Sequence, residues 1–516
     1  VDLKALQRTD KHVLWQIDFA ETFTGKNPGF DIAIANPPYL RQELIDRSAK
    51  EFNLLSKKAL MRKLFGDMNG TMPDGKCDLY IFFFFRTQMI VTQKFGIYTF
   101  ICSTSWMDDD FGASLQDLIV NSTSRGIILE NQKQRAFESA DINTAISILI
   151  NKELKSRSES ISFVAIDNDK TNLLSNFKQV NLDVEIKTIE LKKESLFAYS
   201  EKKGSYIRNG KWGSKFFRTP KVLARLLEKH GDMFLNLGDV CDISYGSKPG
   251  IVNFFIIDKK IIELFKIESV FYEPIITSTR EIDYLNIEQC KIRKFAFICN
   301  MSKPELKNKG YLGALNYIEW GEAQFSKTSA SHTIAGVAWP NVKSVSTNKP
   351  YWYSYNIASR GDFIASALIR ERFIFANNPR RRADTNMFYH GVFSDNDHST
   401  LYCALINSTL CYSFVEILGR LNIGGRINLY GTEYKQLPIV KASLFKPEES
   451  ASIVYQFDKI SSRPILNITE ELNMNDRRQL DLMIIECLNL SDVLSVDDLY
   501  LDLFKAVSRR IQREDY

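Results

Sequence analysis

Four consecutive residues, Asn36, Pro37, Pro38 and Tyr39, carry the clearest chemical potential in the chain. The side-chain carbonyl of Asn36 and the backbone carbonyl of Pro37 are two hydrogen-bond acceptors, and the prolines keep the loop rigid because their φ angle is fixed. The Tyr39 ring adds a face for stacking. The set suits a planar ligand with an exocyclic amino group, since two acceptors aimed at that group make its nitrogen a better nucleophile. A nucleic-acid base that reacts in this way must first leave the duplex.

The surrounding pattern predicts the elements that position this loop. Residues 30–35 form an apolar run that Asn-Pro-Pro stops, which is typical of a buried strand ending in a rigid loop. The alternation over residues 1–165 predicts an open α/β sheet with sites at the carboxyl ends of its strands. The further predicted elements are a buried helix at 78–91, a strand at 96–102, a helix at 115–120 and strands at 124–129 and 142–150.

Composition and charge limit the class of protein. With 516 residues, 44% hydrophobic and 25% charged, the chain is expected to form several folded domains and is not a disordered protein. A net charge of +5 excludes a histone-like polycation but permits an enzyme with a locally basic cleft. The eight cysteines form no Cys-x-x-Cys pair, so they predict reduced core thiols of a cytoplasmic protein and no metal site. The longest apolar run, at 79–85, is far short of the roughly 20 residues of a membrane span.

Three further segments differ in texture. Residues 166–205 are polar and predict a connecting region. Residues 206–440 are rich in aromatic residues, Gly, Pro and Asn, which favours a mixed α+β domain with long loops. Residues 441–516 are charged and helical in pattern.

With these motifs in place, the chain resembles adenine-N6 DNA methyltransferases, especially those fused in type IIG restriction–modification enzymes. The resemblance rests on the Asn-Pro-Pro-Tyr loop and on its context, in matching order and spacing. The context comprises residues 15–23, 29–35, 76–82, 95–106 and 136–146. The resemblance implies a partial Rossmann-like methyltransferase sheet, followed by a mixed α+β target-recognition domain and a helical C-terminal segment.

The resemblance also implies roles. Asn36 and the Pro37 carbonyl would accept hydrogen bonds from the adenine amino group, and Tyr39 and Phe137 would sandwich the base. The methyl group would come from S-adenosylmethionine by direct transfer, with no covalent enzyme intermediate. An Asn at the first position of the loop favours adenine over cytosine. Asp18 would contact the adenine of the cofactor, although a solvated surface position is the competing interpretation.

Two expected parts are not found in the sequence. A Gly-rich turn and an acidic residue that grip S-adenosylmethionine should precede Asn36, and Gly246, Gly424 and Gly425 do not follow a buried strand and open a helix. We therefore expect the cofactor-binding half to lie outside this chain, so that Val1 is not a natural start or a second chain completes the sheet. A nuclease part is also expected upstream. Residues 185–187 have the form acidic residue-x-Lys, which can hold Mg²⁺ in nucleases, but an amphipathic surface strand is the favoured interpretation.

The recognition half carries weaker matches and a basic pattern. Residues 237–246, 274–282, 405–410, 424–427 and 437–439 resemble, in order, segments of target-recognition domains of this family. Basic side chains of this region are suited to DNA phosphates and guanine edges, with a solvated basic face as the alternative. The candidates for DNA contact are Lys211, Arg380, Arg381, Arg382 and Arg426.

The sequence thus predicts site-specific adenine-N6 methylation of double-stranded DNA, by a chain with the catalytic loop and the recognition domain. The alternative is a DNA-binding specificity module that has no activity of its own and docks on a catalytic partner. A methyltransferase acting on RNA or on protein glutamine is a third hypothesis, which the long recognition-like region disfavours.

Overall fold

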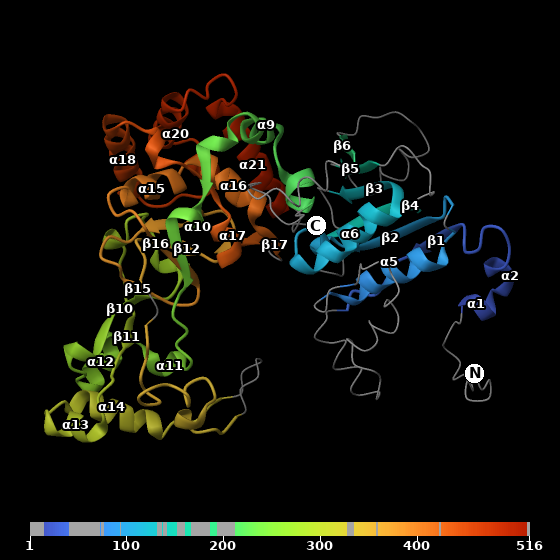
Figure 1. Ribbon diagram of the computed structural model, residues 1–516. Coiled ribbons are helices and arrows are strands. Elements are labelled where there is room, and N and C mark those ends of the chain that lie inside the picture. Colours follow the sequence, from blue (N-terminus) through green and yellow to red (C-terminus); the bar gives the residue numbers. More distant parts are fainter. Residues whose placement is uncertain are drawn as a thin grey trace, which may run out of the picture. The chain divides into compact units, whose positions relative to one another are not determined.

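The computed structural model describes residues 15–40, 73, 77–92, 94–131, 137, 142–151, 160–166, 186–192, 212–327, 335–357, 360–422 and 425–512. These residues form two compact units (Figure 1). Unit 1 comprises residues 1–219, 423–425 and 508–516, and unit 2 comprises residues 220–422 and 426–507. The helical segment predicted from residue 441 thus lies, up to residue 507, in the same unit as residues 220–422.

Unit 1 is built on a six-stranded sheet with the strand order β1-β2-β4-β3-β5-β6. β1 and β2 are parallel, whereas β4 runs antiparallel to both β2 and β3. The carboxyl ends of β1, β2 and β3 therefore lie at the same edge of the sheet. The strands are β1 (Ile32–Ala35), β2 (Ile97–Ser103), β3 (Thr123–Asn131), β4 (Thr144–Asn151), β5 (Ser160–Ile166) and β6 (Ile186–Lys192).

The helices of unit 1 confirm the predicted α/β alternation. They are α1 (Trp15–Asp18), α2 (Ala20–Phe23), α5 (Leu79–Ile90) and α6 (Ala113–Ser122). α5 packs on the sheet through Phe84, whose ring centroid lies 4.6 Å from that of Phe100 in β2. The buried Trp106 continues this core, and its ring lies 5.7 Å from that of Trp212.

The prediction that the strand before the Asn-Pro-Pro-Tyr loop is buried is wrong. β1 is the edge strand of the sheet, and Ile32 and Ile34 are 59% and 78% exposed. In the described part of the chain β1 pairs with β2 alone, so its other edge is open. An apolar edge strand of this kind is a template for pairing with a further strand.

Gly29 allows the start of β1 to approach the chain after α5 closely. Its φ angle is +119°, and an added Cβ atom would meet the Ile90 carbonyl oxygen and the Thr92 nitrogen at 2.8 Å. This approach lets the Phe30 N–H donate to the Ile90 carbonyl, and the Thr92 N–H donate to the Phe30 carbonyl, both at 2.9 Å. Gly29 therefore determines where the chain joins the sheet ahead of β1.

Unit 2 contains small sheets in place of one large sheet. Their strand orders are β15-β10-β11-β9, β14-β12-β16-β8, β13-β18-β17 and β19-β7. The strands are β7 (Phe234–Asn236), β8 (Cys241–Tyr245), β9 (Ile256–Ile257), β10 (Tyr272–Ile276), β11 (Phe295–Phe297), β12 (Phe363–Ser366), β13 (Leu368–Ile369), β14 (Phe375–Asn377), β15 (Ala383–Asp384), β16 (Phe388–Phe393), β17 (Arg420–Asn422), β18 (Arg426–Asn428) and β19 (Pro438–Val440).

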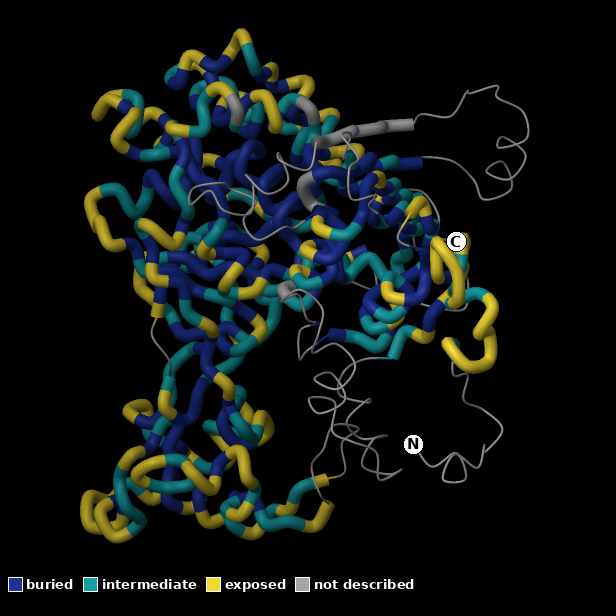
Figure 2. Tube along the Cα trace, turned by 45° about the vertical axis from the view of Figure 1, so that its right-hand side comes forward, coloured by how far each residue is buried: buried dark blue, intermediate teal, exposed yellow. Residues whose placement is uncertain are grey.

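Helices cover these sheets and form the C-terminal part of unit 2. Every residue of α16 is buried. In Figure 2 the buried segments, in dark blue, lie in the interior and the exposed ones, in yellow, on the outside. The helices are α9 (Lys221–His230), α10 (Leu237–Val240), α11 (Val252–Phe255), α12 (Lys259–Phe265), α13 (Lys303–Asn308), α14 (Leu312–Glu322), α15 (Ser399–Ile406), α16 (Thr409–Leu418), α17 (Gly431–Lys435), α18 (Pro447–Ser461), α19 (Ile468–Glu471), α20 (Asn475–Cys487) and α21 (Val496–Gln512).

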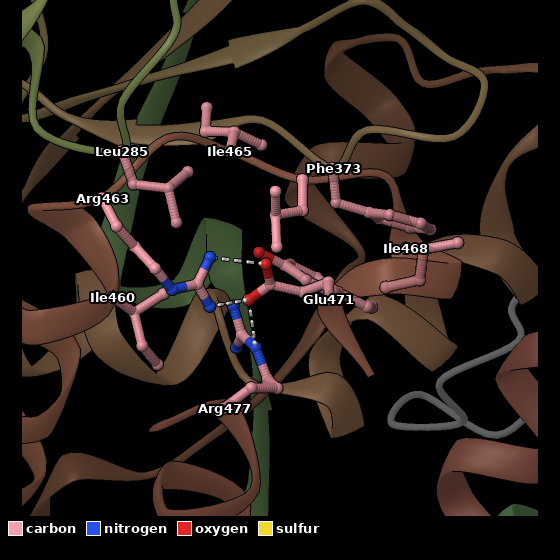
Figure 3. A pocket seen from close by; sticks show the side chains of 10 residues that line it. Leu285, Phe373, Ile460, Arg463, Ile465, Ile468, Glu471 and Arg477 are labelled. Atoms are coloured by element: carbon pink, nitrogen blue, oxygen red, sulfur yellow. Dashed lines mark hydrogen bonds and ion pairs between the residues drawn. The ribbon is translucent and has the colours of Figure 1, made fainter. Parts of the chain in front are cut away.

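A buried ionic network ties the C-terminal helices together (Figure 3). Glu471 accepts hydrogen bonds from Arg463 at 2.8 and 2.9 Å and from Arg477 at 2.9 Å. Arg463 also binds Asp476, at 2.6 and 3.0 Å. Arg477 is 1% exposed and donates further to the Asn407 carbonyl. A small pocket adjoins this network, but its guanidinium groups already have carboxylate partners, so the network is a structural feature.

No single helix in the described residues is long and apolar enough to cross a membrane; the bent pair α15 and α16 passes by length and composition together.

Candidate functional site

The Asn-Pro-Pro-Tyr loop lies at the carboxyl edge of the unit 1 sheet, where the alternating pattern predicts a site. β1 ends at Ala35, which pairs with Phe100 of β2. The backbone N–H of Leu79, at the start of α5, donates to the Leu40 carbonyl at 2.9 Å and anchors the far end of the loop. Pro37 is buried and Asn36 is exposed. The Asn36 amide is therefore held at the surface by a loop whose backbone is fixed at both ends.

Tyr39 joins the loop to the neighbouring strand. Its hydroxyl lies 2.9 Å from Asn36 Oδ1 and 3.0 Å from the Ile101 carbonyl oxygen, and it donates its single proton to these two acceptors. Burial, and secondarily the nearby Cys102, raises the pKa of Tyr39 to about 12. Tyr39 is therefore a neutral donor at physiological pH, and its bond fixes the position of the Asn36 carbonyl.

A second layer of hydroxyl groups supports Tyr39. The Tyr80 ring lies edge-on to the Tyr39 ring, at 6.3 Å and 89°. Tyr80 Oη lies 3.0 Å from Ser105 Oγ, which lies 2.9 Å from Ser103 Oγ. Burial raises the pKa of Tyr80 well above its ordinary value, so this hydroxyl also stays neutral. Tyr80 lies in the segment 76–82 that contributes to the resemblance, but the sequence gives no signal for the two serines, because serine is common in loops.

Phe137 lies beside Tyr39, although the two residues are 98 positions apart in the sequence. It belongs to the segment between the end of β3 and the start of β4, which lie at the same edge of the sheet as the loop. The two ring centroids are 6.4 Å apart and the ring planes meet at 61°. The structure therefore brings together both aromatic residues that the resemblance assigns to the base. Since the rings are not parallel, a base between them requires one ring to turn.

Asp18 is not brought to the loop. It ends α1, and the next residue, Phe19, packs against Phe30 with ring centroids 5.4 Å apart. Phe30 lies just before the first residue of β1, whereas the loop follows the last. Asp18 is therefore placed near the opposite end of the strand from Asn36.

The surroundings of the loop fit S-adenosylmethionine only in part. The described residues around Tyr39 offer aromatic rings and hydroxyl groups, which suit a base. A strand, a Gly-rich turn and a helix N-terminus, which would hold the cofactor, do not occur in sequence at the carboxyl edge formed by the described strands of unit 1.

The predicted basic cluster at 380–382 is largely neutralised. Arg382 forms two hydrogen bonds with Glu288, at 3.0 and 2.7 Å, and lowers the pKa of that carboxyl. Arg381, whose φ angle is +46°, pairs with Asp362 at 2.8 Å. Arg380 shares Glu288 at 3.4 Å, and its side chain is 74% exposed. Three guanidinium groups thus face two carboxylates, and Arg380 is the member that projects furthest into solvent.

The other two residues predicted to contact DNA are Arg426 and Lys211. Arg426 is exposed on β18 and forms no ion pair with another described residue. Lys211 lies outside the described residues.

The part of the chain that carries the Asn-Pro-Pro-Tyr loop is similar to a family of methylases of restriction–modification systems. Residues 2–137 match the family described as Eco57I restriction-modification methylase. The sequence-based resemblance to restriction–modification methyltransferases is confirmed at this level. A comparison with curated protein sequences gave no match.

Solved structures similar to the chain come from the same kind of system. The type IIG restriction endonuclease BpuSI is 12% identical over 94% of this chain and 55% of that chain, with a TM-score of 0.44. The type IIL restriction–modification enzyme MmeI, in complex with DNA, is 12% identical over 93% of this chain and 57% of that chain, with a TM-score of 0.49. The chain thus spans little more than half the length of these proteins.

Proposed function

We propose that this chain takes part in site-specific DNA adenine-N6 methylation within a type IIG restriction–modification enzyme. The observation that carries the proposal is the convergence of Asn36, Tyr39 and Phe137 at the carboxyl edge of the unit 1 sheet. Two acceptors and two aromatic rings at one place suit a flipped-out base with an amino group. The family match over residues 2–137 supports methylation as the reaction class.

The loop can orient the target amino group while Tyr39 holds the loop. A carbonyl oxygen has two lone pairs. In the Asn36 side chain, Tyr39 engages Oδ1 from one direction and leaves the second lone pair for an amino N–H of the base. The backbone carbonyl of Pro37 accepts from the other N–H. Both acceptors bind the amino hydrogens, so that the nitrogen lone pair is less delocalised into the ring and the nitrogen is a better nucleophile.

The two aromatic rings bind the base after it leaves the duplex. Stacking on an aromatic ring contributes about 1–3 kcal/mol per base, which offsets part of the cost of unstacking. Because the Tyr39 ring is restrained through its hydroxyl, Phe137 is the ring that turns to become parallel to the base.

The proposed partners follow from the same reaction. S-adenosylmethionine supplies the methyl group, and the DNA duplex is bound by unit 2 acting as the target-recognition domain. The proposed DNA contacts are Arg380, Arg381, Arg382, Lys211 and Arg426. A cytoplasmic location, where DNA and cofactor are both present, is expected.

The test is substitution of Asn36 in the full-length enzyme. Asn36→Ala should abolish methyl transfer to DNA, measured with tritiated S-adenosylmethionine, while DNA affinity in a fluorescence anisotropy titration stays unchanged. Asn36 is exposed, so the loss is not expected to come from unfolding. Asn308→Ala, at an exposed position of α13, is the matched control and should retain activity. Transfer at the normal rate by Asn36→Ala would show that the loop is not catalytic.

The open edge of β1 favours a second hypothesis, a recognition module that needs a further strand to become active. Ile32 and Ile34 are too exposed for a stable sheet edge. We infer that a strand of a catalytic partner chain pairs with β1 and completes the cofactor site. Calorimetric titration of this chain with S-adenosylmethionine should therefore give no binding heat. Binding by this chain would contradict the inference.

A further inference from the structure

The three-stranded sheet of unit 2 has one buried and one exposed face. Leu368 of β13 pairs with Asn428 of β18, which pairs with Arg420 of β17. The next row, Ile369, Ile427 and Leu421, points the other way because side chains alternate along a strand. Ile369 and Ile427 are fully buried. The row of Leu368, Asn428 and Arg420, together with Arg426 two residues before Asn428, therefore lies on the outer face.

The outer face continues beyond β18 into Tyr430. Tyr430 is 45% exposed, and the Asn428 side-chain N–H donates to its hydroxyl at 3.1 Å. The guanidinium of Arg420 lies 5.3 Å from the centre of the Tyr430 ring. Leu368, Arg420, Arg426, Asn428 and Tyr430 therefore form one continuous surface, which we call the β18 face.

The β18 face is held rigidly from beneath. Glu433, which is fully buried, accepts hydrogen bonds from Arg420 Nε and Nη2 at 3.0 and 2.9 Å. Its second oxygen accepts from the backbone N–H of Tyr430 at 3.0 Å. The carboxylate thus lies under the face and not on it. Arg426 contributes a charge that no other described residue neutralises, so the β18 face is electropositive.

Apolar and aromatic side chains extend the surface beside the β18 face. Met387 and Tyr245 are 45% and 47% exposed. The Tyr245 and Tyr389 rings lie 4.8 Å apart. The backbone of Met387 joins this area to β13, because the Ala367 N–H donates to the Met387 carbonyl at 3.3 Å.

We propose that the β18 face reads base edges in the major groove of the target DNA, with Arg426 as a specificity-determining residue. A β-ribbon fits the major groove, where Arg pairs with guanine through two donors, Asn pairs with adenine, and apolar groups contact the thymine methyl. Arg426 supplies the two donors and Leu368 the apolar group on rigid strands, whereas the Asn428 amide is committed to the fold, because its Nδ2 donates to Tyr430 and its Oδ1 is buried. The cluster at 380–382, by contrast, is mostly committed to Glu288 and Asp362. The inference rests on the proposed function, because it assumes that unit 2 binds duplex DNA.

The experiment is a binding selection that needs no methylation. The full chain is incubated with a pool of DNA duplexes with a randomised centre, and bound duplexes are sequenced. The wild type should enrich one motif. Arg426→Ala should lower the affinity for that motif by roughly 5- to 150-fold, which corresponds to the loss of one two-donor contact to a base. It should also relax the preference at one base pair while leaving the other positions unchanged.

Two further variants sharpen the test. Arg426→Lys keeps the charge but loses the two-donor geometry, so it should relax the same base pair while the salt dependence of binding stays near that of the wild type. Arg293→Ala removes an equally exposed arginine outside the β18 face and should behave as the wild type. Thermal unfolding of each variant checks that the fold is retained.

The outcomes separate this inference from the proposed function. If Arg426→Ala and Arg426→Lys enrich the wild-type motif with every position retained, the β18 face does not read bases, while DNA binding by unit 2 stands. If Arg426→Ala weakens all sequences equally, Arg426 contacts phosphates only, and the proposal is again overturned. If the wild type binds no duplex, both the inference and the proposed recognition role fail.

Discussion

Removal of a single hydroxyl group, in Tyr39→Phe, tests whether the loop is catalytic through the position of Asn36. The substitution keeps the aromatic ring but deletes the bonds to Asn36 Oδ1 at 2.9 Å and to the Ile101 carbonyl at 3.0 Å. One proton serves both acceptors, so the loss equals about one hydrogen bond, or roughly 0.5–1.5 kcal/mol. If that free energy orients Asn36 for the reaction, the rate of methyl transfer should fall about 2- to 13-fold.

Tyr39→Ala separates the hydroxyl from the ring. It also removes the stacking surface, worth about 1–3 kcal/mol, so its rate should fall by a further factor of roughly 5 to 150. The assay is the initial rate of tritiated methyl incorporation into bacterial genomic DNA, with the full-length enzyme in excess over target sites.

The matched control for Tyr39→Phe is Tyr98→Phe in β2. The Tyr98 hydroxyl is buried and has no hydrogen-bond partner among the described residues, so its removal should not slow transfer. A role of the Tyr39 hydroxyl in positioning Asn36 would be refuted if Tyr39→Phe transferred methyl groups as fast as the wild type. It would be refuted equally if Tyr39→Phe were as slow as Tyr39→Ala, because the hydroxyl would then act in the chemistry itself.

Four further predictions concern stability, DNA binding and self-association. Glu471→Gln should lower the free energy of unfolding by about 3–5 kcal/mol in urea titrations, because it leaves buried guanidinium charge uncompensated; equal stability would show that the network contributes nothing. Burial alone would raise the pKa of Glu471, but Arg477 and Arg463 hold it below its ordinary value. The Glu471 carboxylate therefore contributes its full stabilisation above the pKa that the group has in the unfolded state. This contribution should be lost as the pH falls through the lower pKa of the folded state. Urea unfolding at a series of pH values measures the loss. Arg380→Ala should reduce the slope of log affinity against log salt by about 1, and an unchanged slope would remove Arg380 from the interface. Ile34→Lys should reduce self-association of this chain in analytical ultracentrifugation, because it places a charge on the open edge of β1; unaltered self-association would show that this edge is not the contact.

The sequence by itself determined the parts of the protein that depend on near neighbours. Asn36 and Tyr39 are three positions apart, so the loop that joins them is a local structure, and the rigid prolines between them are visible in the sequence. The strand before the loop and the helix at 79–90 follow from apolar runs. For Phe137 the order of motifs along the chain predicted a place beside Tyr39, and the two ring centroids lie 6.4 Å apart.

Only the tertiary structure decided which distant residues meet. The Tyr39 hydroxyl reaches Ile101, 62 positions away, because parallel pairing of β1 and β2 aligns their carboxyl ends. The sequence shows Arg382 as a positive charge, but not that Glu288, 94 positions away, forms an ion pair with it. The β18 face depends on strand register, because pairing fixes which alternate side chains point outward. Burial of β1 was predicted from apolar content, whereas its exposure depends on which strands flank it, and a local pattern cannot contain that information.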